Sequence, residues 1–220
     1  MFDFLQQAPI TPLAALVRAG AIAVLLVAAP PAAAQTVPGS TPVPIQSQNS
    51  RWVVDLVHSQ LDFRVRHLLG RVRGTFTRWY AVLLSTDPNL PQGTVQVTAE
   101  TASLSTGNSY RDADLRSGRF FAVDSYPRLT FEGTGIVATD STVNLHGILT
   151  IKGISRPVTL TGQYRGVATD GEGHERIAFD ASTTVDRRDY GLTFNELVGG
   201  RQLIGNDVEI TIAIEALRVR

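Results

Sequence analysis

Residues 61–67 read LDFRVRH, a stretch in which apolar and charged side chains alternate. One face carries the apolar side chains and a histidine: Leu61, Phe63, Val65 and His67. The other face carries only charged side chains: Asp62, Arg64 and Arg66. Strict alternation is typical of a β-strand with one buried face, because successive side chains of a strand point to opposite sides.

The same alternation recurs along the rest of the chain. The apolar sides of the further candidate strands are Val95/Val97/Ala99, Leu129/Phe131/Gly133, Val143/Leu145/Gly147/Leu149/Ile151, Val158/Leu160/Gly162/Tyr164, Ile177/Phe179/Ala181/Thr183/Val185 and Val208/Ile210/Ile212/Ile214. Turn-forming residues separate several of them, at 152–153, 170–173 and 205–207. Many strands with one apolar face each predict an all-β fold, either an antiparallel barrel or a sandwich.

One stretch breaks this period and predicts a short helix near residues 109–118. Ser109 and Asp112 have the spacing of a capping box, and Asp112 and Arg116 can pair four residues apart. Gly118 can end the helix. Phe120 and the aromatic residue beside it follow directly, so we expect the helix and these rings to cover one end of the fold.

Small residues occupy several inward positions where a solid core would use larger ones: Ala99, Gly133, Gly147, Gly162 and Ala181. A barrel of about eight strands either fills its interior with side chains or holds one small ligand. These residues therefore indicate free space, or else the glycines mark bends in the strands. The same faces also carry large aromatic side chains, so both interpretations stay open.

Composition excludes several classes of protein. The 220 residues contain 20 Lys and Arg, 20 Asp and Glu, and no cysteine. Formal neutrality argues against a nucleic-acid binder, whose affinity comes from basic side chains and counterion release. The absence of cysteine excludes disulfides, thiol nucleophiles and cysteine zinc sites.

The N-terminal segment predicts export from the cytoplasm. Residues 19–29 form an uncharged apolar run that is too short to span a bilayer as a helix, and Ala32–Ala34 fit a cleavage site. We therefore expect a signal peptide at 1–34, a flexible Pro- and Ser-rich linker at 35–50, and one domain at 51–220 in the periplasm. An uncleaved N-terminal anchor is the alternative.

Several stretches together resemble the YceI-like family of periplasmic polyisoprenoid-binding proteins. They are WVVDLVHSQLDFRVRHL at 52–68, GTF at 74–76, SLSTGNSYRDADLRSGRFFAVDSYPRLTFEG at 103–133, GILTIKGISRPVTL at 147–160 and DRRDYGL at 186–192. The resemblance implies a lipocalin-like β-barrel that encloses a long isoprenoid or fatty chain, with polar residues receiving its head group near the opening.

Carried over by position, the resemblance points to polar candidates for ligand binding: His58, Ser59, His67, Arg111, Asp112, Asp186 and Arg187. Inward aromatic and small residues complete the candidate site: Phe63, Phe120, Phe131, Phe179, Gly147 and Gly162. Structural roles compete with these assignments. His67 can be a core residue, Asp112 can cap the helix, and 186–189 can form a salt-bridged turn.

The leading hypothesis is a binding or carrier protein for a polyisoprenoid, an isoprenoid quinone or a fatty-acid derivative. Association costs roughly 4–15 kcal/mol and a buried methylene contributes about 0.8 kcal/mol, so such a ligand needs roughly ten or more carbons. We expect no catalytic residue, no metal and no required cofactor, and a homodimer is compatible with the pattern. The alternatives are an enzyme acting on a lipid-like substrate, an outer-membrane barrel, and a carbohydrate-binding jelly roll using Trp79 and Tyr80.

Overall fold

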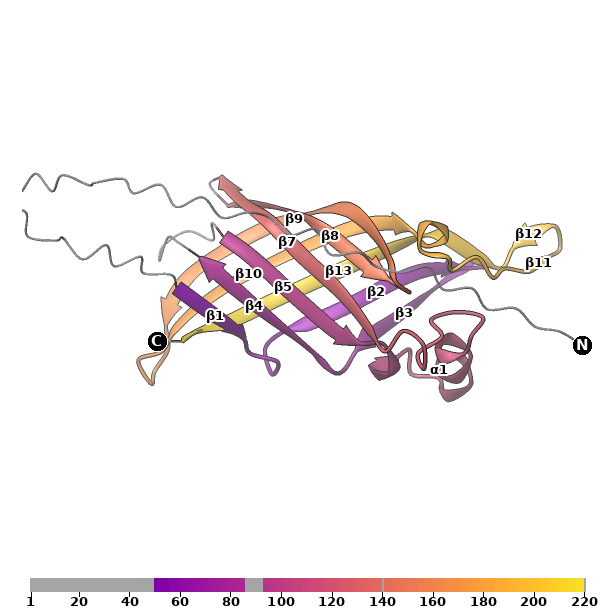
Figure 1. Cartoon of the computed structure of the whole chain (residues 1–220), viewed down its shortest axis with the longest axis horizontal. Coiled ribbons are helices and arrows are strands. Elements are labelled where there is room, and N and C mark those ends of the chain that lie inside the picture. The colour runs from indigo at the N-terminus through magenta and orange to yellow at the C-terminus, as the bar shows by residue number, and fades with distance from the viewer. Residues whose placement is uncertain (1–49, 86–92, 140, 220) are drawn as a thin grey trace, which may run out of the picture. The chain divides into compact units, whose positions relative to one another are not determined.

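The computed structural model describes residues 50–85, 93–139 and 141–219. The predicted signal peptide and nearly all of the predicted linker lie outside these residues. Eight antiparallel strands close into a barrel (Figure 1), in the ring order β1 (Ser50–Val54), β4 (Trp79–Ser85), β5 (Gly93–Glu100), β7 (Arg128–Thr139), β8 (Thr142–Ile151), β9 (Ile154–Thr169), β10 (Glu175–Asp186) and β13 (Ile204–Val219). The predicted all-β, antiparallel barrel of about eight strands is confirmed.

The ring closes because β13 has two partners on one of its edges. Its last residues pair with β1, where Val54 lies opposite Ala216, and its earlier residues pair with β2 (Gln60–His67), where Gln60 lies opposite Ala213. The backbone of Glu215 lies between the two pairings. The hydroxyl of Ser59 forms hydrogen bonds with the backbone of Glu215 in place of a neighbouring strand. Its Oγ accepts from the Glu215 N–H at 2.9 Å and donates to the Glu215 carbonyl oxygen at 3.1 Å.

The other elements extend the barrel at one end (Figure 1). They are β3 (Gly70–Phe76), the 3-10 helix η1 (Thr101–Ser103), β6 (Leu104–Ser105), α1 (Ser109–Arg116), the 3-10 helix η2 (Arg187–Tyr190), β11 (Leu197–Val198) and β12 (Arg201–Gln202). In the described part of the chain, no helix is long and apolar enough to cross a membrane.

The short helix lies where the sequence predicts it, but its capping differs. Asn108, not Ser109, is the N-cap, and its side chain accepts a hydrogen bond from the backbone N–H of Arg111. Asp112 accepts hydrogen bonds from Thr106 instead of pairing with Arg116. Asn competes well with Ser for the cap position, so the expected capping box was placed one residue late.

The turn between β8 and β9 matches the sequence closely. Lys152 and Gly153 both have positive φ, at 50° and 72°, and Ile151 pairs with Ile154 across them. A two-residue connection of this kind follows the right-handed twist of the strands and fixes their register.

Candidate functional site

The barrel is filled with side chains at one end. Trp52 and Phe179 are buried there, together with Leu83 and Ile177, whereas Trp79 is buried at the other end of β4, beside η1. These residues belong to the core and do not line the cavity described below. Tyr80 points to the opposite side of its strand and is exposed, so Trp79 and Tyr80 form no aromatic platform for a carbohydrate.

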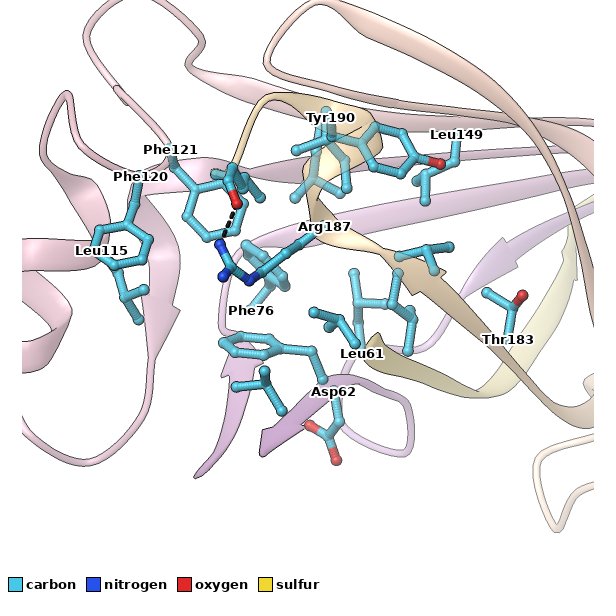
Figure 2. Close-up of a pocket in the computed structure, with 18 of the residues that line it drawn as sticks. Leu61, Asp62, Phe76, Leu115, Phe120, Phe121, Leu149, Thr183, Arg187 and Tyr190 are labelled. Carbon is cyan, nitrogen blue, oxygen red and sulfur yellow. Dashed lines mark hydrogen bonds between the residues drawn. The ribbon is translucent and has the colours of Figure 1, made fainter. Parts of the chain in front are cut away.

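The other end encloses an apolar cavity of about 380 Å³ (Figure 2). Its walls come from most strands of the barrel, from β2 and from the chain after α1. Apolar side chains make up most of the lining: Leu61, Phe63, Val65, Val72, Phe76, Val95, Val97, Leu115, Phe120, Phe121, Leu129, Phe131, Leu145, Leu149, Ile151, Val158, Leu160, Val185, Leu192, Phe194, Leu203, Ile204, Val208, Ile210, Ile212 and Ile214. A cavity so lined suits an apolar ligand.

The cavity reaches the surface near α1. His67, Arg119 and Glu196 line it and are exposed, whereas deep lining residues such as Val95 are fully buried. Arg119 pairs with Asp114 at 3.0 Å and its guanidinium lies 4.2 Å from the ring centroid of Phe194. Charged side chains therefore edge the opening, and apolar ones form the interior.

Arg187 is a buried cation in the wall of this cavity (Figure 2). Its Nε–H donates to the carbonyl oxygen of Gly205 at 2.8 Å, and its Nη1 donates to the carbonyl oxygen of Leu192. Among the described residues it forms no ion pair and its Nη2 has no hydrogen-bond partner. Burial lowers the pKa of Arg187, and the charge of Asp186 opposes this effect. A guanidinium stays protonated in proteins, so the cavity contains a positive charge without a directly bound anion.

Tyr190 is the second polar group in the cavity wall. Its hydroxyl is buried and has no hydrogen-bond partner among the described residues, and Figure 2 shows it pointing toward Leu149. Burial, reinforced by the charge of Asp189, raises the pKa of Tyr190. The phenol therefore stays protonated at neutral pH, and its hydroxyl meets a ligand once the side chains packed around it move.

Part of the predicted ligand-binding set lines this cavity: Phe63, His67, Phe120, Phe131, Arg111 and Arg187. The inward direction predicted for His67 is confirmed, although its position at the end of β2 leaves it exposed. Arg111 lines the opening but donates from Nε and Nη2 to the hydroxyl and carbonyl oxygens of Thr106. Its guanidinium thus already has partners within the protein.

Other predicted positions lie away from the cavity. His58 and Ser59 precede β2, at the end of that strand opposite His67. Phe179 belongs to the filled half of the barrel. Asp112 is buried against Thr106, and Asp186 pairs with Arg188 at 2.5 Å on the outer surface. Hydrogen bonds from Arg188 lower the pKa of Asp186 to about 2, which supports the structural role considered for that turn.

The two predicted glycines do not line the cavity either. A Cβ added at Gly147 would collide with the ring of Phe131 and the carbonyl oxygen of Glu132. A Cβ at Gly162 would collide with the backbone of Asp180 on the neighbouring strand. Gly147 therefore makes room for an aromatic ring and Gly162 for a close approach of strands, which corrects the interpretation that they leave space for a ligand.

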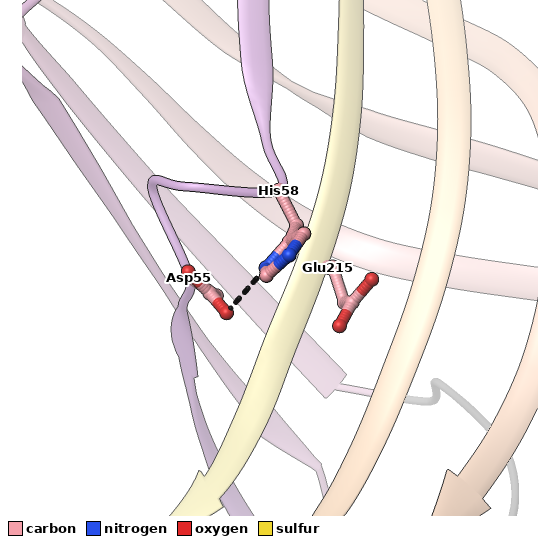
Figure 3. Close-up of side chains that lie close together, drawn as sticks. All are labelled: Asp55, His58 and Glu215. Atoms are coloured by element: carbon pink, nitrogen blue, oxygen red, sulfur yellow. Dashed lines mark hydrogen bonds and ion pairs between the residues drawn. The ribbon is translucent and has the colours of Figure 1, made fainter. Parts of the chain in front are cut away.

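Three potential metal ligands lie together beside the filled half: Asp55, His58 and Glu215 (Figure 3). His58 contacts Asp55 at 2.9 Å. Nη1 of Arg176 donates to Asp55 at 2.8 Å and to Glu215 at 2.7 Å, so the protein already supplies a cation to both carboxylates. This arrangement fits a structural ion-pair network. The expectation that no metal binds stays a prediction.

Sequence reasoning missed several residues of the cavity wall. Tyr190 lies in the DRRDYG stretch that carried the family resemblance, and Phe121 adjoins the predicted Phe120, so both could have been found. Leu115 lies in the stretch 103–133 that also carried the resemblance, so it could have been found as well. Phe194 had no such signal, because it lies in a loop whose packing the alternating pattern does not report.

These features define a closed antiparallel barrel with an apolar cavity that opens beside a short helix. The chain matches the YceI-like domain family over residues 52–216 and belongs to it. A UPF0312 protein of Pseudomonas paraeruginosa is 31% identical over 162 residues, which cover 73% of this chain and 82% of that protein.

Solved structures share the fold. The Campylobacter jejuni YceI protein superposes with a TM-score of 0.59 at 26% identity, over 70% of this chain and 90% of that one. A polyisoprenoid-binding domain from Saccharophagus degradans has a TM-score of 0.61 at 14% identity, over 78% of this chain and 99% of that one.

Proposed function

We propose that this protein binds the long apolar chain of a polyisoprenoid or related lipid in its barrel cavity and carries it unchanged. The observation that carries the proposal is the cavity itself, whose lining is mostly apolar and includes the polar side chains of Arg187 and Tyr190, both buried. The polyisoprenoid-binding domain with the same fold supports this class of ligand.

The size of the cavity bounds the part of the ligand that is enclosed. An apolar cavity of about 150 Å³ holds benzene, so one of about 380 Å³ corresponds to about fifteen carbons. Three isoprene units contain this number of carbons. A longer chain would extend through the opening beside α1, or would require the rings of Phe120 and Phe121 to move aside.

The polar groups favour a ligand that carries an oxygen acceptor. Arg187 offers a charge-assisted hydrogen bond to a phosphate or carboxylate, and Tyr190 offers a neutral one to a carbonyl or hydroxyl. A prenyl phosphate, a fatty acid and an isoprenoid quinone each meet part of this requirement. We infer that the head group lies near Arg187, toward the opening.

The expected location completes the proposal. A signal peptide at 1–34 would deliver the domain to the periplasm, where an apolar lipid needs protection from water during transfer. The alternative is an enzyme acting on a lipid-like substrate, which would return a changed molecule. Recovery of the bound lipid and its comparison with the molecule supplied distinguishes the two.

The direct test is a titration with farnesol, which has fifteen carbons, against two matched variants of β13. Ile210 lines the cavity and Thr211 is exposed on the outside of the barrel. We expect Ile210→Trp to fill the cavity and weaken binding at least about tenfold, and Thr211→Trp to bind like the wild type. Equal binding of farnesol by both folded variants would show that the ligand does not bind in the cavity.

A further inference from the structure

Two hairpin tips lie side by side at the open end of the barrel (Figure 1). One is residues 66–73, which comprises the end of β2, the turn at Leu68 and Leu69 and the start of β3. The other is residues 196–202, which contains β11 and β12. The backbone N–H of Leu68 donates to the carbonyl oxygen of Leu203 at 2.7 Å, and Arg66 donates to the carbonyl oxygen of Gln202 at 3.2 Å. We call the two tips together the tip surface.

The tip surface exposes large apolar side chains to solvent. Leu69 is 82% exposed and Leu197 is 72% exposed, and Val198 beside it is also exposed. These residues stand at the points of the hairpins. Grouped apolar side chains on a surface commonly mark contact with a partner or a membrane.

The same surface is basic. Its two segments hold four arginines, Arg66, Arg71, Arg73 and Arg201, against one acid, Glu196, in a chain that is formally neutral. Arg66 and Arg71 lie directly opposite each other on neighbouring strands, an arrangement that destabilises a sheet through like-charge repulsion. No ion pair joins any of these arginines to a carboxylate among the described residues. Asp186, Asp207 and Glu209 line the same hollow as Arg66 and Arg71 and offset part of this repulsion, and an external anion would relieve the rest.

The tip surface also borders the cavity. His67 and Val72 from one hairpin tip and Glu196 from the other line the cavity, as does Leu203, which directly follows the second tip. Whatever contacts the tips therefore meets the opening through which the proposed ligand enters.

We propose that the tip surface docks reversibly onto an anionic lipid bilayer. The leucines enter the headgroup region and the arginines contact lipid phosphates, so that the lipid ligand passes between the bilayer and the cavity without crossing water. Apolar tips flanked by arginines fit a lipid surface better than a protein partner, because a bilayer accepts both groups without a shaped pocket. This proposal rests on the proposed lipid-binding function.

The test uses the full-length mature chain and flotation with two kinds of vesicle, phosphatidylcholine alone and phosphatidylcholine mixed with phosphatidylglycerol. We expect binding to the anionic vesicles that weakens as salt is added. Each arginine near an anionic surface contributes about fivefold to partitioning, so Arg71→Gln combined with Arg73→Gln should weaken binding about 25-fold.

The apolar contribution is tested by Leu69→Glu combined with Leu197→Glu, which should abolish flotation. The matched control is Val57→Glu. Val57 is also highly exposed, but it lies before β2, at the end of that strand opposite the tip surface, and should leave flotation unchanged. Wild-type binding by the tip variants, or equal loss in the Val57 control, would overturn the proposal.

Two further measurements separate this proposal from its alternatives. The tip variants should bind free farnesol as tightly as the wild type does, because their changes lie outside the cavity. If the wild type itself does not bind farnesol, the proposed lipid-binding function is wrong. If it binds farnesol but does not float with vesicles, only the docking proposal is wrong. If the wild type fails to float but forms a dimer that Leu69→Glu with Leu197→Glu breaks, the surface is a contact between copies of this chain and the membrane proposal is wrong.

Discussion

The Nε–H of Arg187 donates a hydrogen bond to the carbonyl oxygen of Gly205 at 2.8 Å, which ties η2 to the beginning of β13. Because this partner is a carbonyl and not a carboxylate, the bond orients the guanidinium without neutralising it. The positive charge is thus held in the cavity wall before any ligand arrives, and the protein does not need to order it on binding.

Replacement of this arginine should discriminate between ligands by charge. A hydrogen bond to a charged group contributes about 1.5–3 kcal/mol, so Arg187→Gln should weaken binding of farnesyl phosphate roughly tenfold to a hundredfold. Binding of farnesol, which has no charge, should change less. Isothermal titration calorimetry with both ligands measures the difference.

The matched control is Arg111→Gln, because Arg111 also lines the cavity but donates to Thr106. It should affect farnesyl phosphate less than Arg187→Gln does. Should Arg187→Gln fail to fold, Arg187→Lys keeps the charge and supplies the comparison. Equal losses for the charged and uncharged ligands would place the head group elsewhere.

Tyr190→Phe should have opposite effects on the free protein and on its complex. An unpaired buried hydroxyl costs about 1–3 kcal/mol, so its removal should stabilise the free protein against denaturant by up to about that amount. If the hydroxyl donates to a ligand, the same variant should bind a quinone or prenyl alcohol more weakly. Urea unfolding with and without ligand measures both effects, and a destabilised free protein would show that the hydroxyl has a partner.

Gly147→Ala should destabilise the protein, because the new Cβ would meet the ring of Phe131 and the carbonyl oxygen of Glu132. Overpacking of this kind costs about 1–3 kcal/mol. Gly171→Ala is the control, since a Cβ there meets nothing within 4 Å. Thermal unfolding compares the two, and an unchanged transition in Gly147→Ala would contradict the packing argument.

Acid should weaken the ion-pair network around Asp55. Hydrogen bonds from Arg176 and then from His58 lower the pKa of Asp55 from 3.8 to about 2. A group whose pKa is lower in the folded state stabilises the fold above its unfolded pKa and loses this contribution as the pH falls toward the folded value. The stability gap between wild type and Asp55→Asn should therefore shrink as the pH falls from about 4 to about 2. Denaturant unfolding at several pH values measures this gap, and a gap independent of pH would contradict the assignment.

Much of the fold could be predicted because alternation reports directly on one local property, the face to which each side chain points. Leu61, Phe63 and Val65 point inward as the pattern predicts, and the turn at Lys152 and Gly153 forms where its residues favour it. The pattern could not reveal that β13 divides one edge between β1 and β2. That closure depends on pairing between residues far apart in the chain.

The candidate site was harder to predict because it depends on position along the strands as well as on face. His58 and His67 stand at opposite ends of β2, which spans 8 residues. At about 3.3 Å per residue the strand separates its two ends by roughly 25 Å, so one head group cannot contact both histidines. The small inward residues were ambiguous for a related reason. Side chains or backbone of the neighbouring strand decide whether the space beside a glycine is filled or free, and the pattern within one strand does not reveal them.

The measurement that tests the lipid-binding proposal most directly is native mass spectrometry of the protein purified from its own host, with chemical identification of any bound molecule. We expect one long-chain lipid per chain, recovered unchanged, and its loss in Ile210→Trp but not in Thr211→Trp. A protein that carries no lipid and does not take up farnesol, or one that returns a chemically altered molecule, would contradict the proposal.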